Sequence, residues 1–152
     1  MIAVIQRVYS ASVVADGVLS GKINKGLYIL LGVKEGDGEC DSVALAEKIS
    51  KLRIFSDENG KMNLSVKDID GEVLVVSNFT LAANYAHGNR PDYLLAAAPE
   101  FAKRLYEHFI SEVAKRLGKC ESGVFGADMV TDMRTDGPVT IVMDSDILLK
   151  RR

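Results

Sequence analysis

The first part of the chain carries the hydrophobic pattern of β-strands. Apolar residues dominate positions 2–8 and 12–15, which lead to Asp16-Gly17, a dipeptide suited to the positive φ angles of a tight hairpin turn. Residues 27–33 then form a short, almost continuous apolar run bounded by glycines, which is typical of a strand buried on both faces. We therefore expect an opening β-hairpin followed by a central strand.

Two later segments show the spacing of amphipathic helices. The first begins after Asp41, which we interpret as its N-cap, and has apolar residues at three-residue steps: Val43, Ala46, Ile49 and Leu52. The second begins at Pro99, ends at Gly118 and has apolar residues at four-residue steps: Phe101, Leu105, Phe109 and Val113. Both patterns predict helices with one face packed on a sheet.

The remaining segments predict turns and further strands. Residues 57–60 and the Asp70-Gly71 pair are typical of turns, and residues 72–77 of a buried strand. Residues 124–133 and 139–143 alternate loosely, which predicts a terminal hairpin or two strands joined by a shaped loop. No linker or repeat divides the chain, so we expect a single domain over residues 1–152. Its predicted class is α+β: a small β-barrel-like sheet flanked by two helices.

Composition narrows the function. The 152 residues are 47% hydrophobic and 26% charged, as in folded globular proteins, and 19 basic against 21 acidic residues give a net charge of −2. An RNA partner would therefore have to be held locally. We expect no membrane association, because no apolar run approaches 18 residues. Two separated cysteines and two isolated histidines predict a reducing, cytoplasmic location with no metal and no cofactor.

Candidate chemistry is concentrated where the strand at residues 72–77 ends. Ser77, Asn78 and Thr80 could line a pocket or merely satisfy local backbone groups, and no His, Lys or Asp is spaced to activate the Thr80 hydroxyl. Arg90 could hold a phosphate or remain solvated, and so could the basic end at residues 150–152. Another group of candidates alternates along one face of a predicted strand: Phe125, Ala127 and Met129. Their side chains could belong to the core or form the wall of a pocket.

Five short strings point to a family. They lie at residues 1–8 (MIAVIQRV), 77–81 (SNFTL), 88–91 (GNRP), 125–129 (FGADM) and 136–140 (DGPVT). In this order and at these separations, the chain resembles the bacterial D-aminoacyl-tRNA deacylases, formerly called D-tyrosyl-tRNA deacylases. The resemblance implies a homodimer that hydrolyses the ester between a D-amino acid and the terminal adenosine of tRNA, and so removes D-residues from translation.

The resemblance also implies roles for particular residues. In that family the bond corresponding to Gly137-Pro138 is cis and enters the pocket of the other subunit, where its carbonyl groups bind the substrate α-amino group and obstruct an L side chain. Arg7 would orient this filter loop. Phe79 and Thr80 would act mainly through backbone N–H groups at the oxyanion. Substrate would contact the remaining motif residues: Ser77, Asn78, Phe125, Ala127 and Met129.

Two departures and several alternatives accompany this interpretation. Asn78 replaces the family glutamine, so the contact of that longer amide must shift or be lost, and Thr135 replaces the common asparagine beside the filter. Either Thr80 Oγ attacks the ester, or the 2′-hydroxyl of the tRNA helps to activate water. We favour the second because no base lies near Thr80. Other functions compatible with the fold are noncatalytic binding of RNA ends, and editing of glycyl- or L-aminoacyl-tRNA with a trans Gly137-Pro138 bond.

Overall fold

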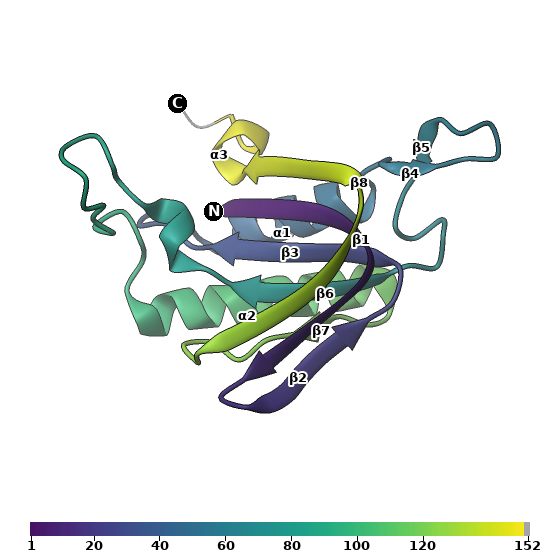
Figure 1. The fold of residues 1–152 in the computed structure, drawn as a ribbon. Helices are drawn as coiled ribbons and strands as arrows, with labels where there is room; N and C mark the ends of the chain where they lie inside the picture. Colours follow the sequence, from purple (N-terminus) through teal and green to yellow (C-terminus); the bar gives the residue numbers. More distant parts are fainter. Residues whose placement is uncertain (151–152) are drawn as a thin grey trace.

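The computed structural model describes residues 1–150 and is built on a six-stranded sheet (Figure 1). The strand order is β2-β1-β3-β6-β7, and β8 pairs with the other edge of β1. Arg151 and Arg152, from the predicted basic end, lie outside the described residues. The strands are β1 (Ile2–Ala15), β2 (Val18–Ile23), β3 (Gly26–Gly32), β6 (Glu72–Ser77), β7 (Glu121–Ser122) and β8 (Met129–Asp144).

The long strand β1 gives the sheet its barrel-like shape. Its first half pairs with β3, from Ile2 opposite Gly32 to Val8 opposite Gly26, whereas its second half pairs with β2. The predicted hairpin turn joins β1 and β2, with Asp16 at φ 47° and Gly17 at φ 81°. Strands β2 and β7 stand at opposite ends of the strand order, yet Ser20 Oγ in β2 donates a hydrogen bond of 2.9 Å to the Ser122 carbonyl in β7. The two ends of the sheet therefore nearly meet.

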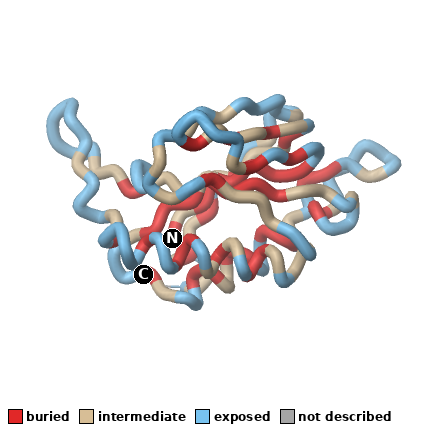
Figure 2. The backbone as a smooth tube through the Cα atoms, turned by 90° about the horizontal axis from the view of Figure 1, so that it is seen from below, coloured by how far each residue is buried: buried red, intermediate tan, exposed pale blue. Residues whose placement is uncertain are grey.

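The predicted central strand is confirmed, because β3 is buried on both faces between β1 and β6. Leu27, Ile29 and Leu31 face the core beneath the helices. Tyr28, between them, faces a second apolar cluster inside the curved sheet, to which β6 contributes Leu74. This alternation is the period of two of a β-strand, and it places apolar side chains on each side. Buried residues accordingly form the middle of the molecule in Figure 2.

Two helices cover one face of the sheet (Figure 1): α1 (Glu39–Ser50) and α2 (Pro99–Leu117). The start at Pro99 and the stop at Gly118, with φ 85°, are confirmed for α2. The predicted N-cap of α1 is wrong, because Gly38 occupies that position. Asp41 is the third helical residue, and its carboxylate accepts the Gly38 N–H at 2.8 Å. The pattern misplaced the start because an acidic residue fits either position.

The C-terminal part of the chain differs from the prediction. One continuous strand, β8, replaces the expected pair and follows β1 from Met129 opposite Ala15 to Asp144 opposite Ile2. Its register is irregular around Arg134 to Thr140, because a proline cannot donate to the ladder there. Phe125 and Ala127 precede this strand, in a turn, rather than lying along it. Elements too short for a periodic signal were also missed: β4 (Phe55–Ser56), β5 (Met62–Leu64), η1 (Phe79–Ala82) and α3 (Ser145–Leu148).

No helix within residues 1–150 has both the length and the apolar composition needed to cross a bilayer.

Candidate active site

A cavity of about 620 Å³ opens where β6 ends. Its walls come from residues 77–79 after β6, from the start of α2 and from the turn at residues 125–129. That turn is anchored to the β1–β2 hairpin, because the Asp16 N–H donates to the Asp128 carbonyl at 2.9 Å. Most of the residues that the sequence indicated for a pocket therefore do line one: Ser77, Asn78, Phe79, Phe125, Ala127 and Met129.

Asn78 organises the backbone at the mouth of the cavity. Its N–H donates to the Leu31 carbonyl at 2.8 Å, and its side-chain Oδ1 accepts both the N–H of Thr80, at 3.1 Å, and the Thr80 hydroxyl. Asn78 thus caps the short helix η1. Gly32 makes this arrangement possible, because a Cβ at that position would lie 2.9 Å from the Asn78 carbonyl oxygen. Asn78, which replaces the family glutamine, therefore has a defined structural contact with Thr80.

The two backbone amides expected at an oxyanion differ in availability. The Thr80 N–H already donates to Asn78 Oδ1, so it is occupied in this conformation. The Phe79 N–H, by contrast, has no acceptor among residues 1–150. Phe79 lines the cavity, whereas the exposed Thr80 does not. Of the pair, Phe79 is therefore the donor available to a developing negative charge.

The cavity walls offer few groups that could act as a general base. Among the described residues that form its walls there is no His, Lys or Cys, and the titratable side chains are those of Tyr93, Tyr106 and Asp128. The Tyr106 hydroxyl is buried 2.9 Å from the Val75 carbonyl, to which it donates. Burial raises the pKa of this phenol, so it remains protonated at neutral pH. The Thr80 hydroxyl donates to Asn78, and no side chain is in place to deprotonate it.

The pocket also contains residues that sequence reasoning missed. Ala97 and Tyr106 belong to the buried face around α2 and line the cavity as well. Tyr93 closes its rim by an edge-on contact with Phe79, with ring centroids 5.0 Å apart. Ala97 precedes α2 and so has no helical spacing, and within α2 the pocket-lining Tyr106 has the same period as a core residue, so the sequence pattern could not reveal either position.

Gly137 and Pro138 lie on β8, away from this cavity. The peptide bond between them is cis, as the family resemblance implies and unlike the trans bond of the alternative editing enzyme. Both residues are exposed, and neither lines the cavity. Met129 does line it, but Gly137 lies eight residues further along β8. Within one chain, this motif is therefore separate from the pocket.

Comparison with known proteins identifies the family. The family model described as D-Tyr-tRNA(Tyr) deacylase matches residues 4–144, nearly the whole chain. The chain belongs to this family. It is 50% identical over 146 residues to the D-aminoacyl-tRNA deacylase of Flavobacterium johnsoniae, covering 95% of this chain and 97% of that protein. It is 53% identical over 146 residues, with the same coverage, to that of Porphyromonas gingivalis.

Solved structures share the fold. A chain described as c-Myc DNA Unwinding Element Binding Protein matches with a TM-score of 0.88 and 39% identity, covering 95% of this chain and 98% of that one. A probable eukaryotic D-amino acid tRNA deacylase matches with a TM-score of 0.80, covering 93% and 97%. At 13% identity, the second match speaks to the fold alone. The barrel-like α+β architecture is thus that of the deacylase family.

Arg7, which the family resemblance associates with the filter, contacts Asp136, the residue directly before Gly137. Its Nε lies 3.0 Å from Asp136 Oδ2, its Nη2 donates to Asp136 Oδ1 at 3.1 Å, and its Nη1 donates to the Ile54 carbonyl at 2.6 Å. Both charged side chains are largely buried. The hydrogen bond from Nη2 and the ion-pair contact of Nε involve both oxygens of the Asp136 carboxylate, which restricts it more than a single contact would. Arg7 therefore fixes the backbone directly before Gly137.

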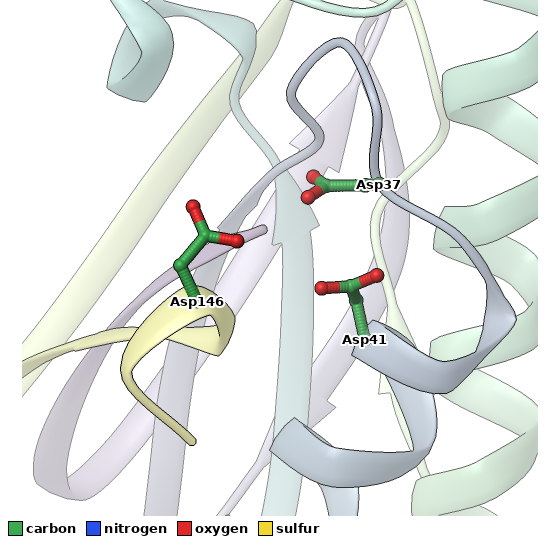
Figure 3. Close-up of side chains that lie close together, drawn as sticks. All are labelled: Asp37, Asp41 and Asp146. Carbon is green, nitrogen blue, oxygen red and sulfur yellow. The ribbon is translucent and has the colours of Figure 1, made fainter. Parts of the chain in front are cut away.

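A cluster of three carboxylates lies outside the cavity (Figure 3). Asp37, Asp41 and Asp146 point toward one another from the loop before α1, from α1 and from α3. Two cations pair with two of them: the Met1 ammonium group donates to Asp37 at 2.6 Å, and Lys34 Nζ, which also pairs with Asp144, donates to Asp146 at 2.6 Å. Asp41 accepts the helix-start amide described above. The cluster therefore joins β1, α1 and α3 as an internal ion-pair network.

Proposed function

We propose that this chain hydrolyses the ester bond of D-aminoacyl-tRNA in the cytoplasm and releases the D-amino acid and free tRNA. The observation that carries the proposal is the cavity after β6. It is lined by the family's motif residues, and the Phe79 amide at its mouth is unoccupied. A volume of about 620 Å³ lies within the usual range for small-molecule pockets and suits an aminoacyl group on an adenosine.

The chemistry follows from what the pocket offers. Water attacks the ester carbonyl carbon, and the negative charge that develops on the carbonyl oxygen accepts a hydrogen bond from the Phe79 N–H. The bond to the ribose 3′-oxygen then breaks, and that oxygen receives the proton that the water loses. Because the walls lack a His or Lys base, the neighbouring 2′-hydroxyl of the tRNA orients the water and relays the proton. Asn78 keeps the amide in place by capping η1.

The selectivity for D-amino acids is proposed to require a second copy of the chain. Gly137 and Pro138 are exposed and do not line the pocket of their own chain, so they would act in the pocket of a partner. The same strand exposes apolar side chains, with Val130 at 67% and Val142 at 70% exposure. A two-fold dimer that buries this surface would place one filter at each of two identical sites. Arg7 and Asp136 would set the orientation of each filter.

The deciding experiment measures amino acid release from D-tyrosyl-tRNA and L-tyrosyl-tRNA by the purified protein, against the uncatalysed rate. We expect rapid release from the D-ester and none above background from the L-ester. Release from neither would leave an RNA-end-binding protein of the same fold, and release from the L-ester would indicate a different editing enzyme.

An Arg7→Gln variant should narrow the D-to-L rate ratio at least tenfold, because the neutral amide no longer holds Asp136.

A further inference from the structure

A narrow loop projects from the rim of the cavity. Asn84 and Asp92 exchange both backbone hydrogen bonds at 2.9 Å, and Asn84 Nδ2 donates to Asp92 Oδ2 at 3.0 Å. Residues 85–91 beyond this neck are all exposed. We call residues 84–92 the arm. In Figure 1 it is the teal loop that extends from the body of the molecule, on the side away from β4 and β5.

The arm begins and ends at the proposed reaction site. Asn84 follows η1, whose first residue is Phe79, by two positions, and Tyr93 follows the neck directly. Tyr93 lines the cavity and packs edge-on against the Phe79 ring at 5.0 Å. A molecule whose end occupies the cavity would therefore pass beside the arm as it leaves.

The tip of the arm has the chemistry of a single-strand RNA contact. It contains Arg90 and His87 but no acidic side chain, in a protein whose net charge is −2. Arg90 has no carboxylate partner among residues 1–150. Tyr85 is 80% exposed, and its ring stacks on no other aromatic ring of the described chain. Free guanidinium groups bind phosphate, and exposed aromatic rings stack on unpaired bases.

We propose that the arm binds the single-stranded 3′ end of the tRNA at the nucleotides that precede the terminal adenosine. Arg90 contacts a phosphate, and Tyr85 stacks on a base. This inference rests on the proposed function, because it takes the ester to lie in the cavity. It adds a positioning site that holds the RNA chain outside the pocket and so recognises tRNA rather than a free amino acid ester.

A second basic surface lies elsewhere on the molecule. A groove at the far end of α2 contains Lys51, Lys115 and Arg116. Their charges are already matched, because Lys51 pairs with Glu47 at 2.7 Å, and Lys115 and Arg116 both pair with Glu112. The groove also lies at the opposite end of α2 from the cavity. Arg53 and Lys67 also line the groove and form no ion pair among residues 1–150, so proximity to the reacting ester is what favours the arm.

The test compares two substrates and three variants. The substrates are D-tyrosyl-tRNA and the minimal ester 3′-O-D-tyrosyladenosine, which lacks the preceding nucleotides. The variants are the double substitution Tyr85→Ala/Arg90→Gln, the single Arg90→Lys, and Lys61→Gln as a matched control. Lys61 is exposed in the loop between β4 and β5, on the other side of the molecule (Figure 1).

The double variant should lose about tenfold or more in kcat/KM on D-tyrosyl-tRNA, mainly through KM, because it loses both the stacking contact with a base and the contact with a phosphate. It should remain within twofold of the native protein on the minimal ester. The dependence of log kcat/KM on log salt concentration should also flatten by about 0.7, the contribution of one phosphate contact to a single strand. Arg90→Lys should keep the native slope, since it keeps the charge, and so should Lys61→Gln.

Three results would overturn the inference. Equal losses on both substrates would mean that the arm shapes the pocket, and native rates on tRNA would mean that it contacts no RNA. A changed sedimentation coefficient of the double variant would make the arm a contact between protein subunits instead. Failure of the native protein to hydrolyse either substrate is a different result, because it would reject the proposed function itself.

Discussion

At the scale of single residues, the contact between Asn78 and Thr80 bears on how the ester is cleaved. The Thr80 hydroxyl donates to Asn78 Oδ1, and among residues 1–150 it has no hydrogen bond to a base that could remove its proton. We therefore expect Thr80→Ala to retain at least a third of the native rate of D-tyrosine release. A 2′-deoxy terminal adenosine should lower that rate at least 100-fold, because it removes the group that relays the proton. Single-turnover hydrolysis of D-tyrosyl-tRNA measures both effects.

Thr80→Ser is the matched control, since it keeps both the hydroxyl and the backbone amide. If Thr80→Ala were inactive while Thr80→Ser remained active, the hydroxyl would be the nucleophile and the route through the 2′-hydroxyl would be abandoned.

The pocket residues that sequence reasoning found are those carried by short motifs. Ser77, Asn78 and Phe79 follow a recognisable buried strand, and Phe125 belongs to another motif string, so both segments could be assigned to a pocket. The contact of Asn78 with Thr80 could not be predicted, because it depends on side-chain direction after the strand ends. That the Thr80 N–H already donates a hydrogen bond follows from this same contact, and the residue spacing in the sequence could not predict it.

At the scale of elements, the position of η1 depends on its close approach to β3. A Cβ at Gly32 would lie 2.9 Å from both the Asn78 carbonyl oxygen and Leu81 Cβ. Gly32→Ala should therefore displace η1, destabilise the protein by about 1–3 kcal/mol and lower kcat more than tenfold. Chemical denaturation and single-turnover kinetics check the two effects.

Gly38→Ala is a control for the added methyl group, because the new carbon would meet only Cys40 Sγ, at 3.9 Å. It should leave kcat within twofold of the native value. A Gly32→Ala protein with native kcat would show that η1 tolerates the displacement and that its close packing is not needed for catalysis.

The end of α2 carries a pH-dependent contribution to stability. Hydrogen bonds from Lys115 and Arg116 lower the pKa of Glu112 from 4.5 to about 2. The unfolded chain takes up this proton first as the pH falls, so the contribution is complete above pH 4.5 and disappears toward pH 2. The difference in Tm between the native protein and Glu112→Gln should therefore shrink over that window, as measured by circular dichroism.

Glu107→Gln, on an exposed and looser pair with Lys103 at 3.8 Å, should show a smaller difference throughout. A Glu112→Gln difference that stayed constant from pH 5 to pH 2.5 would contradict the assignment.

Elements with a regular pattern and clear ends could be predicted from sequence, and the exceptions have physical causes. α2 has four-residue steps, a proline at its start and a glycine at its end, so both ends were predicted correctly. β8 was divided in two because residues 134–138 contain turn formers. The long β1 strand beside them supplies pairing partners on both sides of that break, and this tertiary contact outweighs the local preference.

At the scale of the whole molecule, the Gly137-Pro138 motif and the cavity are separate within one chain. Gly137 and Pro138 lie on a surface strand, and the cavity lies where that strand begins. In the proposed two-fold pair, each chain would bring its Gly137-Pro138 motif to the pocket of the other. The exposed apolar side chains of β8 supply the kind of surface that such a pair would bury.

Val142 tests this arrangement. It is 70% exposed on β8, opposite Val4 of β1, so a charged side chain at this position can remain solvated in a single folded chain. Val142→Glu would place two carboxylates near the two-fold axis, or one against an apolar surface, and either is unfavourable in a dimer. The variant should sediment near the 16.5 kDa of one chain, keep its far-UV circular dichroism, and hydrolyse D-tyrosyl-tRNA at least 100-fold more slowly.

Raising the protein concentration should partly restore that rate, because mass action reforms the pair. Val142→Thr, similar in shape but uncharged, is the control and should remain dimeric and active. Two results would contradict the arrangement in different ways. A dimeric and active Val142→Glu protein would place the interface on another surface. A monomeric protein could instead release only the D-amino acid, at the native rate. No partner would then be present to supply Gly137 and Pro138, so this result would show that the filter does not act on a partner.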